Sequence, residues 1–176
     1  MTAFLKIDGL NAVLRGHGIR VLRDVTLHVK RGQVHGLVGE SGAGKSMIGK
    51  AVLGVLPHAL TVASGRISLG KDDLSALPRR KRQKIIGART ALIPQDPLTA
   101  LNPSRQIAGQ ITDRLTHTLG MPKGAALARA RQLLEEVQIT DPDRGLPIYP
   151  NEWSGRMRRR VLSAGALAAE PDLIAA

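Results

Sequence analysis

The chain has 176 residues, of which 43% are hydrophobic, which is enough for a globular protein with a substantial core. Its 26 basic and 14 acidic residues give a formal net charge of +12, and the absence of cysteine excludes disulfides and thiolate chemistry. No apolar run approaches the roughly 20 residues that a membrane-spanning helix needs. The first residues also lack the pattern of a secretory signal. From these features we expect a soluble, cytoplasmic chain.

The first thirty residues have the alternation that is typical of half-buried antiparallel strands. Leu5 and Ile7 alternate with polar neighbours. Val25, Leu27 and Val29 alternate in the same way. Between the two runs, the sequence Arg-Gly-His-Gly at 15–18 predicts a hairpin connection.

A glycine-rich segment follows at 39–46, with the sequence Gly-Glu-Ser-Gly-Ala-Gly-Lys-Ser. It fits the phosphate-binding pattern of a glycine, four residues of any type, then Gly-Lys-Ser. Glycines let successive N–H groups surround an anion, lysine adds a positive charge, and the serine hydroxyl is a ligand for Mg²⁺. The apolar run 34–38 predicts a buried strand before this loop, and apolar spacing over 47–56 predicts a helix after it. A purely structural turn is the alternative, which both flanks disfavour.

The middle of the chain predicts three further short elements. Residues 65–70 alternate, with Ile67 and Leu69 on one face of a strand. The charged segment after Pro78 predicts a helix, and the apolar run 91–95 predicts a strand that ends in a polar residue.

The second half of the chain predicts helices and one final strand. The helices are expected at 107–119, 125–137 and 155–169, and an apolar strand begins at 173. In the second helix, the residues expected on the buried face are Leu127, Ala130, Leu134 and Val137.

The basic residues gather in two runs, 79–84 and 156–160. Neither run has interleaved aromatic residues on which nucleic-acid bases could stack. A solvated helix face is the favoured interpretation of the first run, with nucleic-acid binding or contact with an anionic membrane surface as alternatives.

Three features occur in a fixed order: the glycine-rich loop at 39–46, Gln95 at the end of a strand, and Trp-Ser-Gly-Arg-Met at 153–157. Together they resemble the nucleotide-binding subunit of ABC transporters. The strings 36–42, 93–103 and 149–152 are similar to the oligopeptide, dipeptide and nickel importer branch of that family. The resemblance covers nearly the whole chain.

The resemblance implies an α/β fold of the P-loop NTPase type. An antiparallel β-subdomain and a partly parallel core sheet would occupy residues 1–95, a helical subdomain with the signature segment 96–165, and the return to the core sheet 166–176. It also implies ATP and Mg²⁺ as cofactors, with two ATP molecules between two homologous subunits. Transmembrane permease subunits would be the further partners, at the cytoplasmic face of the plasma membrane, and no nucleic acid is expected. The expected function is ATP-driven import of peptides, nickel or similar solutes.

The resemblance also assigns roles to individual residues. Lys45 and Gln95 are expected to be catalytic, because the lysine contacts the outer phosphates and the glutamine reaches both the metal and the attacking water. Ser46 and Gln95 are the expected Mg²⁺ ligands. The ATP-binding residues would be Gly39, Glu40, Ser41, Gly42, Ala43, Gly44, Lys45, Ser46, Met47 and Leu14.

The signature segment, Ser154, Gly155 and Arg156, is expected to contact the ATP held by the opposite subunit. Arg156 stands where the family has a second glycine. Its side chain would either impair the close approach of the backbone to phosphate, which we favour, or pair with the phosphate directly. Trp153 replaces a leucine, with core packing and a contact role as alternatives. Leu14 replaces the aromatic residue that stacks on adenine in the family. The replacement loses a stacking energy of about 1 kcal/mol or more.

In the family, an aspartate for magnesium and a glutamate for the attacking water follow the strand that resembles 173–176. The sequence contains neither, so we expect a C-terminally truncated member that hydrolyses ATP slowly. The alternatives are a non-catalytic nucleotide-binding or dimerisation module and, less favoured, a nucleic-acid-associated ATPase.

Overall fold

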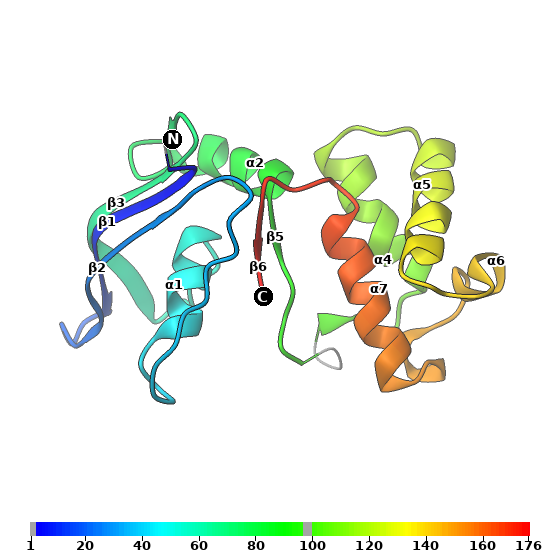
Figure 1. Ribbon diagram of the computed structural model, residues 1–176, viewed down its shortest axis with the longest axis horizontal. Coiled ribbons are helices and arrows are strands. Elements are labelled where there is room, and N and C mark those ends of the chain that lie inside the picture. The colour runs from blue at the N-terminus through cyan, green and yellow to red at the C-terminus, as the bar shows by residue number, and fades with distance from the viewer. Residues whose placement is uncertain (1–2, 97–99) are drawn as a thin grey trace. The chain divides into compact units, whose positions relative to one another are not determined.

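The computed structural model describes residues 3–96 and 100–176 and divides into two compact units, Met1–Gln83 and Lys84–Ala176 (Figure 1). Each unit is described by itself. No helix in the described ranges is long and apolar enough to cross a membrane. The predicted division at residues 95 and 165 follows the subdomains of the family and stays a prediction.

The first unit is built on a four-stranded antiparallel sheet in the order β2-β1-β3-β4. The alternating residues of β1 are buried as the sequence predicts, since Leu5 and Ile7 are 5% and 0% exposed. The hairpin is confirmed as well, because the Gly18 N–H donates to the Leu14 carbonyl at 3.2 Å. The strands are β1 (Leu5–Leu14), β2 (Arg20–Val29), β3 (Leu60–Leu69) and β4 (Asp72–Asp73).

The segment 34–38 is not a strand, so the prediction from its apolar sequence is wrong. Val34 and Val38 are 98% and 95% exposed, and no described residue pairs with the segment through backbone hydrogen bonds. A strand is stable only where a neighbouring strand satisfies its N–H and C=O groups. Apolar composition alone does not supply that neighbour.

Helix α1 (Lys45–Val52) follows the glycine-rich loop as predicted, but it ends before the apolar spacing does. Gly54 has a φ of +67°, the left-handed conformation that terminates many helices. Its N–H donates to the Ala51 carbonyl at 3.2 Å, and the next N–H, of Val55, reaches back to the Lys50 carbonyl at 2.9 Å. This glycine therefore stops the helix before Pro57 could.

Helix α2 (Arg79–Arg89) leads into the second unit, where β5 (Thr90–Leu92) pairs in parallel with β6 (Leu173–Ala175). The helix after Pro78 and the strand at 173 are thus confirmed. The strand predicted at 91–95 is present but ends at Leu92, so Gln95 lies beyond the strand and not at its last residue. The combination of an antiparallel sheet with a parallel pair agrees with the expected α/β class.

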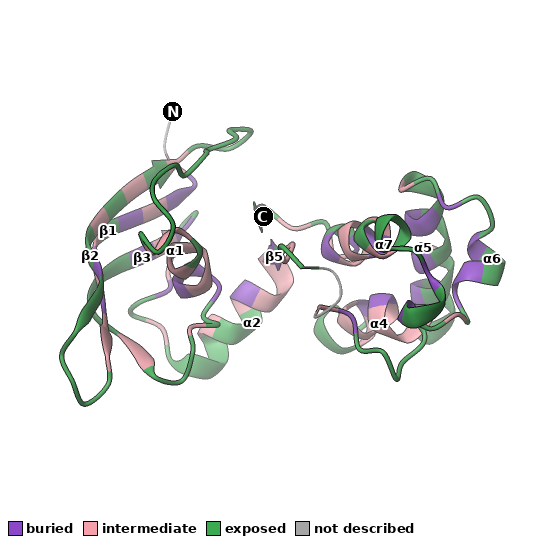
Figure 2. Cartoon of the chain, turned by 90° about the horizontal axis from the view of Figure 1, so that it is seen from below, coloured by how far each residue is buried: buried purple, intermediate pink, exposed green. Residues whose placement is uncertain are grey.

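Helices enclose the core of the second unit, and Figure 2 shows their buried faces turned inward. The expected face of α5 is wrong at one position, because Leu127 is 47% exposed while Ala126 and Leu133 are fully buried. Ala130 and Leu134 are fully buried as predicted, and Val137 packs against the core, so the predicted face fails only at Leu127. The elements are α4 (Ile107–Asp113), the π-helical turn η1 (Arg114–Thr118), α5 (Lys123–Glu136), α6 (Pro142–Gly145), the 3₁₀ turn η2 (Pro150–Glu152) and α7 (Gly155–Leu167).

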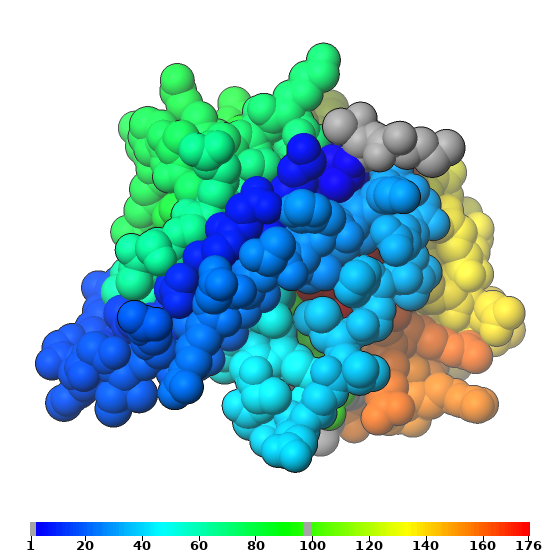
Figure 3. Space-filling model, turned by 60° about the vertical axis from the view of Figure 1, so that its left-hand side comes forward, coloured from blue at the N-terminus to red at the C-terminus, as the bar shows by residue number. Residues whose placement is uncertain are grey.

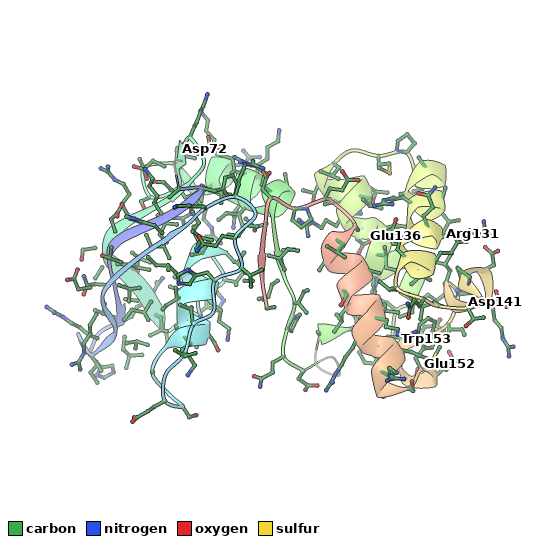
Figure 4. The ribbon with its side chains drawn as sticks, viewed as in Figure 1. Asp72, Arg131, Glu136, Asp141, Glu152 and Trp153 are labelled. Carbon is green, nitrogen blue, oxygen red and sulfur yellow. The ribbon has the colours of Figure 1, made fainter. Side chains whose placement is uncertain are left out.

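Trp153 belongs to this core, which decides between the two interpretations of its sequence position. The side chain is 4% exposed and lies beside the first turn of α7 (Figure 4). A Cβ atom placed on Gly145 would lie 2.8 Å from Cζ2 and 3.1 Å from Cη2 of the indole. The absence of a side chain at Gly145 is therefore what makes room for the tryptophan.

We predict that Gly145→Ala destabilises the protein by about 1–3 kcal/mol, because the new methyl group overlaps the Trp153 ring. The matched control is Gly124→Ala in the first turn of α5, where an added Cβ meets no atom within 4 Å. Chemical denaturation monitored by circular dichroism measures both free energies of unfolding. Equal stability of the two variants would contradict the steric argument.

Candidate functional site

The glycine-rich loop adopts backbone conformations that glycine favours. Gly39, Gly42 and Gly44 have φ angles of +152°, +85° and +85°. Gly44 is the N-cap of α1, and no side chain of the described residues caps that helix end. The loop occupies the surface displayed in Figure 3, where it is coloured light blue to cyan.

Gly44 is packed tightly against strand β2. A Cβ atom at this position would lie 3.0 Å from Cδ2 of Leu22 and 3.3 Å from the carbonyl oxygen of Val21. A side chain is disfavoured both by this tight contact and by the positive φ. The start of α1 is therefore anchored to the sheet at one position, and the sequence pattern did not single out Val21 and Leu22 as its support.

The side chain of Lys45 folds back over the loop. Its Nζ donates to the carbonyls of Gly39 and Glu40, both at 2.7 Å. Ser46, the next residue of the helix, is exposed. No described group accepts a hydrogen bond from the N–H of Lys45 or Ser46. Two free N–H groups, a helix N-terminus and a lysine thus converge, which is the chemistry that binds phosphate.

Two other N–H groups near the loop are used internally. The Ala43 N–H donates to the Glu40 carbonyl at 3.2 Å, and the Met47 N–H donates to the Gly44 carbonyl at 2.9 Å. Ser41 and Glu40 are exposed. Within 39–46, only the N–H of Ala43 donates to a described backbone acceptor, so the other N–H groups of the loop stay available to a ligand.

Magnesium fits this donor set only in part. The Ser46 hydroxyl is an exposed oxygen ligand of the kind that Mg²⁺ binds together with waters and phosphate oxygens. Within the described ranges, no group of three or more His, Cys, Asp or Glu residues could hold a metal ion by itself. A metal bound here would therefore depend on the phosphates of a ligand.

Leu14 lies in the same unit as the loop, at the end of β1. It is half-buried, and its N–H donates to the Ile19 carbonyl at 2.8 Å across the hairpin. Ile19 and Val21, which follow along the chain, are 59% and 36% exposed. An aliphatic surface thus lies on the hairpin whose second strand supports Gly44.

Gln95 lies in the second unit, three residues beyond the end of β5. Pairing with β6 extends one residue past the strand, because the Ile93 N–H donates to the Ala175 carbonyl at 2.8 Å. Gln95 itself is exposed at a bend. The following residues 97–99 of the importer-like string lie outside the described residues.

Ser154 caps helix α7 in the second unit. Its Oγ accepts a hydrogen bond from the Met157 N–H at 3.3 Å, so the serine satisfies one donor of the first turn. Gly155 and Arg156 are exposed, and an added Cβ at Gly155 would meet no atom within 4 Å. No described residue accepts a backbone hydrogen bond from the N–H groups of these two residues at the helix start.

The first turn of α7 contains no acidic residue. Arg156 and Arg159 are exposed, while Arg160 donates to the Gln138 carbonyl at 2.7 Å. Cations at a helix N-terminus are unfavourable unless an anion is near. The local charge thus favours a negatively charged ligand.

The profile of the ABC transporter family matches residues 22–176. The chain belongs to the ABC transporter family. It is 44% identical over 160 residues to the probable D,D-dipeptide transport ATP-binding protein DdpD of Escherichia coli K12, covering 90% of this chain and 48% of that protein. It is 36% identical over 179 residues to the oligopeptide transport ATP-binding protein OppD of Bacillus subtilis 168, covering 100% of this chain and 50% of that protein. The chain spans about half the length of the curated relatives it matches.

Solved structures show the same fold. The dimeric structure of an ATP-binding cassette in a post-hydrolysis state, bound to ADP and Pi, matches with a TM-score of 0.81 and 22% identity, covering 97% of this chain and 72% of that chain. The structure of cbiO1 from Clostridium perfringens, part of the ABC transporter complex cbiONQ, matches with a TM-score of 0.77 and 23% identity, covering 99% and 64%. The ABC-ATPase type of fold expected from the sequence is thus confirmed.

We predict that Ser154→Ala lowers the free energy of unfolding by about 1 kcal/mol, because the Met157 N–H loses its acceptor. Ser163→Ala in the same helix is the control, since its Oγ only donates to the Arg159 carbonyl, which is already within the helix ladder. Urea denaturation of both variants checks the difference. A loss of equal size in Ser163→Ala would contradict a specific capping role.

Proposed function

We propose that the chain is the nucleotide-binding part of an ATP-binding subunit that powers import of peptides by an ABC transporter. The observation that carries the proposal is the phosphate loop: Gly44 is locked against β2, and Lys45 and Ser46 stand at the free N-terminus of α1. The relatives named for dipeptide and oligopeptide transport favour peptides over nickel as the solute class.

ATP would bind with its phosphates at this helix start. Lys45 would exchange the carbonyls of Gly39 and Glu40 for phosphate oxygens, since all of these are acceptors for the same ammonium group. The backbone and side chains of Ser41, Gly42, Ala43 and Met47 would line the rest of the phosphates. Ser46, with Gln95, would complete the coordination of Mg²⁺ around the phosphate oxygens.

A second copy of the subunit, or a homologous one, would complete the site. In this proposal Ser154, Gly155 and Arg156 contact the ATP of the opposite subunit, and the dimeric state of a similar cassette supports it. The open N–H groups at the start of α7 suit a phosphate. Permease subunits would be the further partners, with the ATP-binding subunit at the cytoplasmic face of the plasma membrane.

Gln95 would orient the attacking water and the metal, and Lys45 would stabilise negative charge on the phosphates during transfer. Mg²⁺, when bound, supplies charge neutralisation of the phosphate oxygens. Slow hydrolysis by the chain stays a prediction, because it depends on two carboxylates that the family has beyond the last strand. The same holds for impairment by Arg156, whose exposed side chain is compatible with either effect.

We predict that Lys45→Ala weakens Mg-ATP binding roughly ten- to hundredfold, the effect of losing a charge-assisted hydrogen bond of about 1.5–3 kcal/mol. Lys50→Ala, in the last turn of the same helix, is the matched control and should bind as the wild type does. Isothermal titration calorimetry measures both affinities. Tight binding that survives Lys45→Ala would contradict a phosphate site at this loop.

We predict that Leu14→Phe tightens Mg-ATP binding about fivefold, because an aromatic ring at the end of β1 restores roughly 1 kcal/mol of stacking on the base. The same titration with ribose triphosphate, which lacks a base, should show no gain. An unchanged affinity for ATP, or an equal gain for ribose triphosphate, would contradict a contact between residue 14 and the base.

A further inference from the structure

Three elements of the second unit meet at Arg114, the first residue of the π-helical turn η1. Its Nη2 donates to the Thr90 carbonyl at 2.6 Å, and its Nη1 donates to the Ala166 carbonyl at 3.4 Å. Thr90 begins β5, and Ala166 lies in the last turn of α7. One guanidinium therefore connects a strand and a helix that are 76 residues apart in the sequence.

Partial burial of this charge costs free energy, which the hydrogen bonds of the guanidinium must offset. Arg114 is half-buried, and burial lowers the pKa of its guanidinium. No carboxylate in the described ranges forms an ion pair with it. Its compensation comes from two carbonyls, one of which lies at the C-terminal end of α7, where the helix dipole is negative.

The backbone at Arg114 is also unusual. Helix α4 widens there into a π-helical turn, a feature that is rare and frequently found at functional sites. Beyond the end of the turn at Thr118, the Met121 N–H donates back to the Leu115 carbonyl at 2.9 Å, and Leu115 is fully buried. A packed leucine thus fixes the start of the turn from which Arg114 extends.

The strand end that Arg114 holds is itself firmly attached. Thr90 is 4% exposed, and its Oγ1 donates to the Ile86 carbonyl at 2.8 Å. The adjacent Arg89 pairs with Asp172 at 2.7 Å, next to the first residue of β6. The β5–β6 pair is therefore held by side-chain contacts as well as by its own ladder, and α7 is joined to it through the Arg114 side chain as well as through the connecting segment.

We propose that Arg114 is a positioning residue that couples the strand leading to Gln95 with the helix that begins at Ser154. The two segments that contact ATP in this unit then move together, so that nucleotide sensed at Gln95 shifts the signature segment. This inference rests on the proposed function, which assigns those ATP contacts.

Hydrogen exchange measured by mass spectrometry tests the coupling in the full chain. Exchange is followed at 93–96 and at 154–160 with and without Mg-ATP, at a dilution where sedimentation shows a monomer, so that no opposite subunit contacts the signature. In the wild type, nucleotide should slow exchange at both segments with one midpoint. In Arg114→Met, the response at 93–96 should remain and the response at 154–160 should be lost.

Two further variants separate coupling from general stability. Arg114→Lys keeps the charge but lacks the planar guanidinium that reaches two carbonyls, so this variant should also lose the response at 154–160. It replaces Arg114→Met in the test if that variant does not fold. Arg131→Met removes an exposed arginine that pairs with Asp143 at 3.0 Å, and it should keep both responses. If Arg114 had only a structural role, its substitution would lower the midpoint of thermal unfolding, but Mg-ATP would still slow exchange at both segments together.

The outcomes are distinguishable. Linked responses in a folded Arg114→Met protein overturn the coupling role and leave nucleotide binding intact. In the wild type, slower exchange at 93–96 without any change at 154–160 also overturns the coupling role and leaves nucleotide binding intact. No response at either segment at saturating Mg-ATP contradicts the proposed function and the role of Arg114 together.

Discussion

The contact between Gly44 and strand β2 is the constraint on which the nucleotide site depends. Because there is no side chain, the backbone at Gly44 approaches Leu22 and the Val21 carbonyl closely enough to start α1 directly on the sheet. This placement leaves the first N–H groups of the helix free and aims Lys45 back across the loop. A phosphate site needs donors that are already oriented, and a rigid sheet beneath the loop provides that orientation.

The two units differ in charge as well as in architecture. The first unit contains fourteen of the basic residues and five acidic ones, a net charge of +9 out of the total +12. The second unit is nearly balanced, and its acids are largely engaged, as in the pairs of Arg131 with Asp143 and of Arg129 with Glu136. A net positive charge on the unit that contains the phosphate loop raises the concentration of anionic ligands near that unit.

The second unit achieves rigidity by different means. Its core is aliphatic except for Trp153, which fills the space that Gly145 leaves open. Arg114 then joins this helical core to the β5–β6 pair through carbonyl groups. Trp153 packs beside the start of α7, whereas Arg114 joins the last turn of that helix to the first residue of β5. Neither Gly145 nor Arg114 has a sequence signal, because each acts only through partners that are distant in the chain.

The sequence by itself determined the local features. Alternation over 4–30, the glycine pattern at 39–46 and the importer-like strings sufficed for the hairpin, the phosphate loop and the ABC transporter family, because each depends on neighbours along the chain. It misplaced the segment 34–38 as a strand and Leu127 as buried, since strand pairing and burial depend on which distant groups lie opposite. Only the tertiary structure decided that Trp153 is a core residue, that Val21 and Leu22 hold Gly44, and that Arg114 bridges β5 and α7. Those contacts join residues far apart in sequence, and no periodicity encodes them.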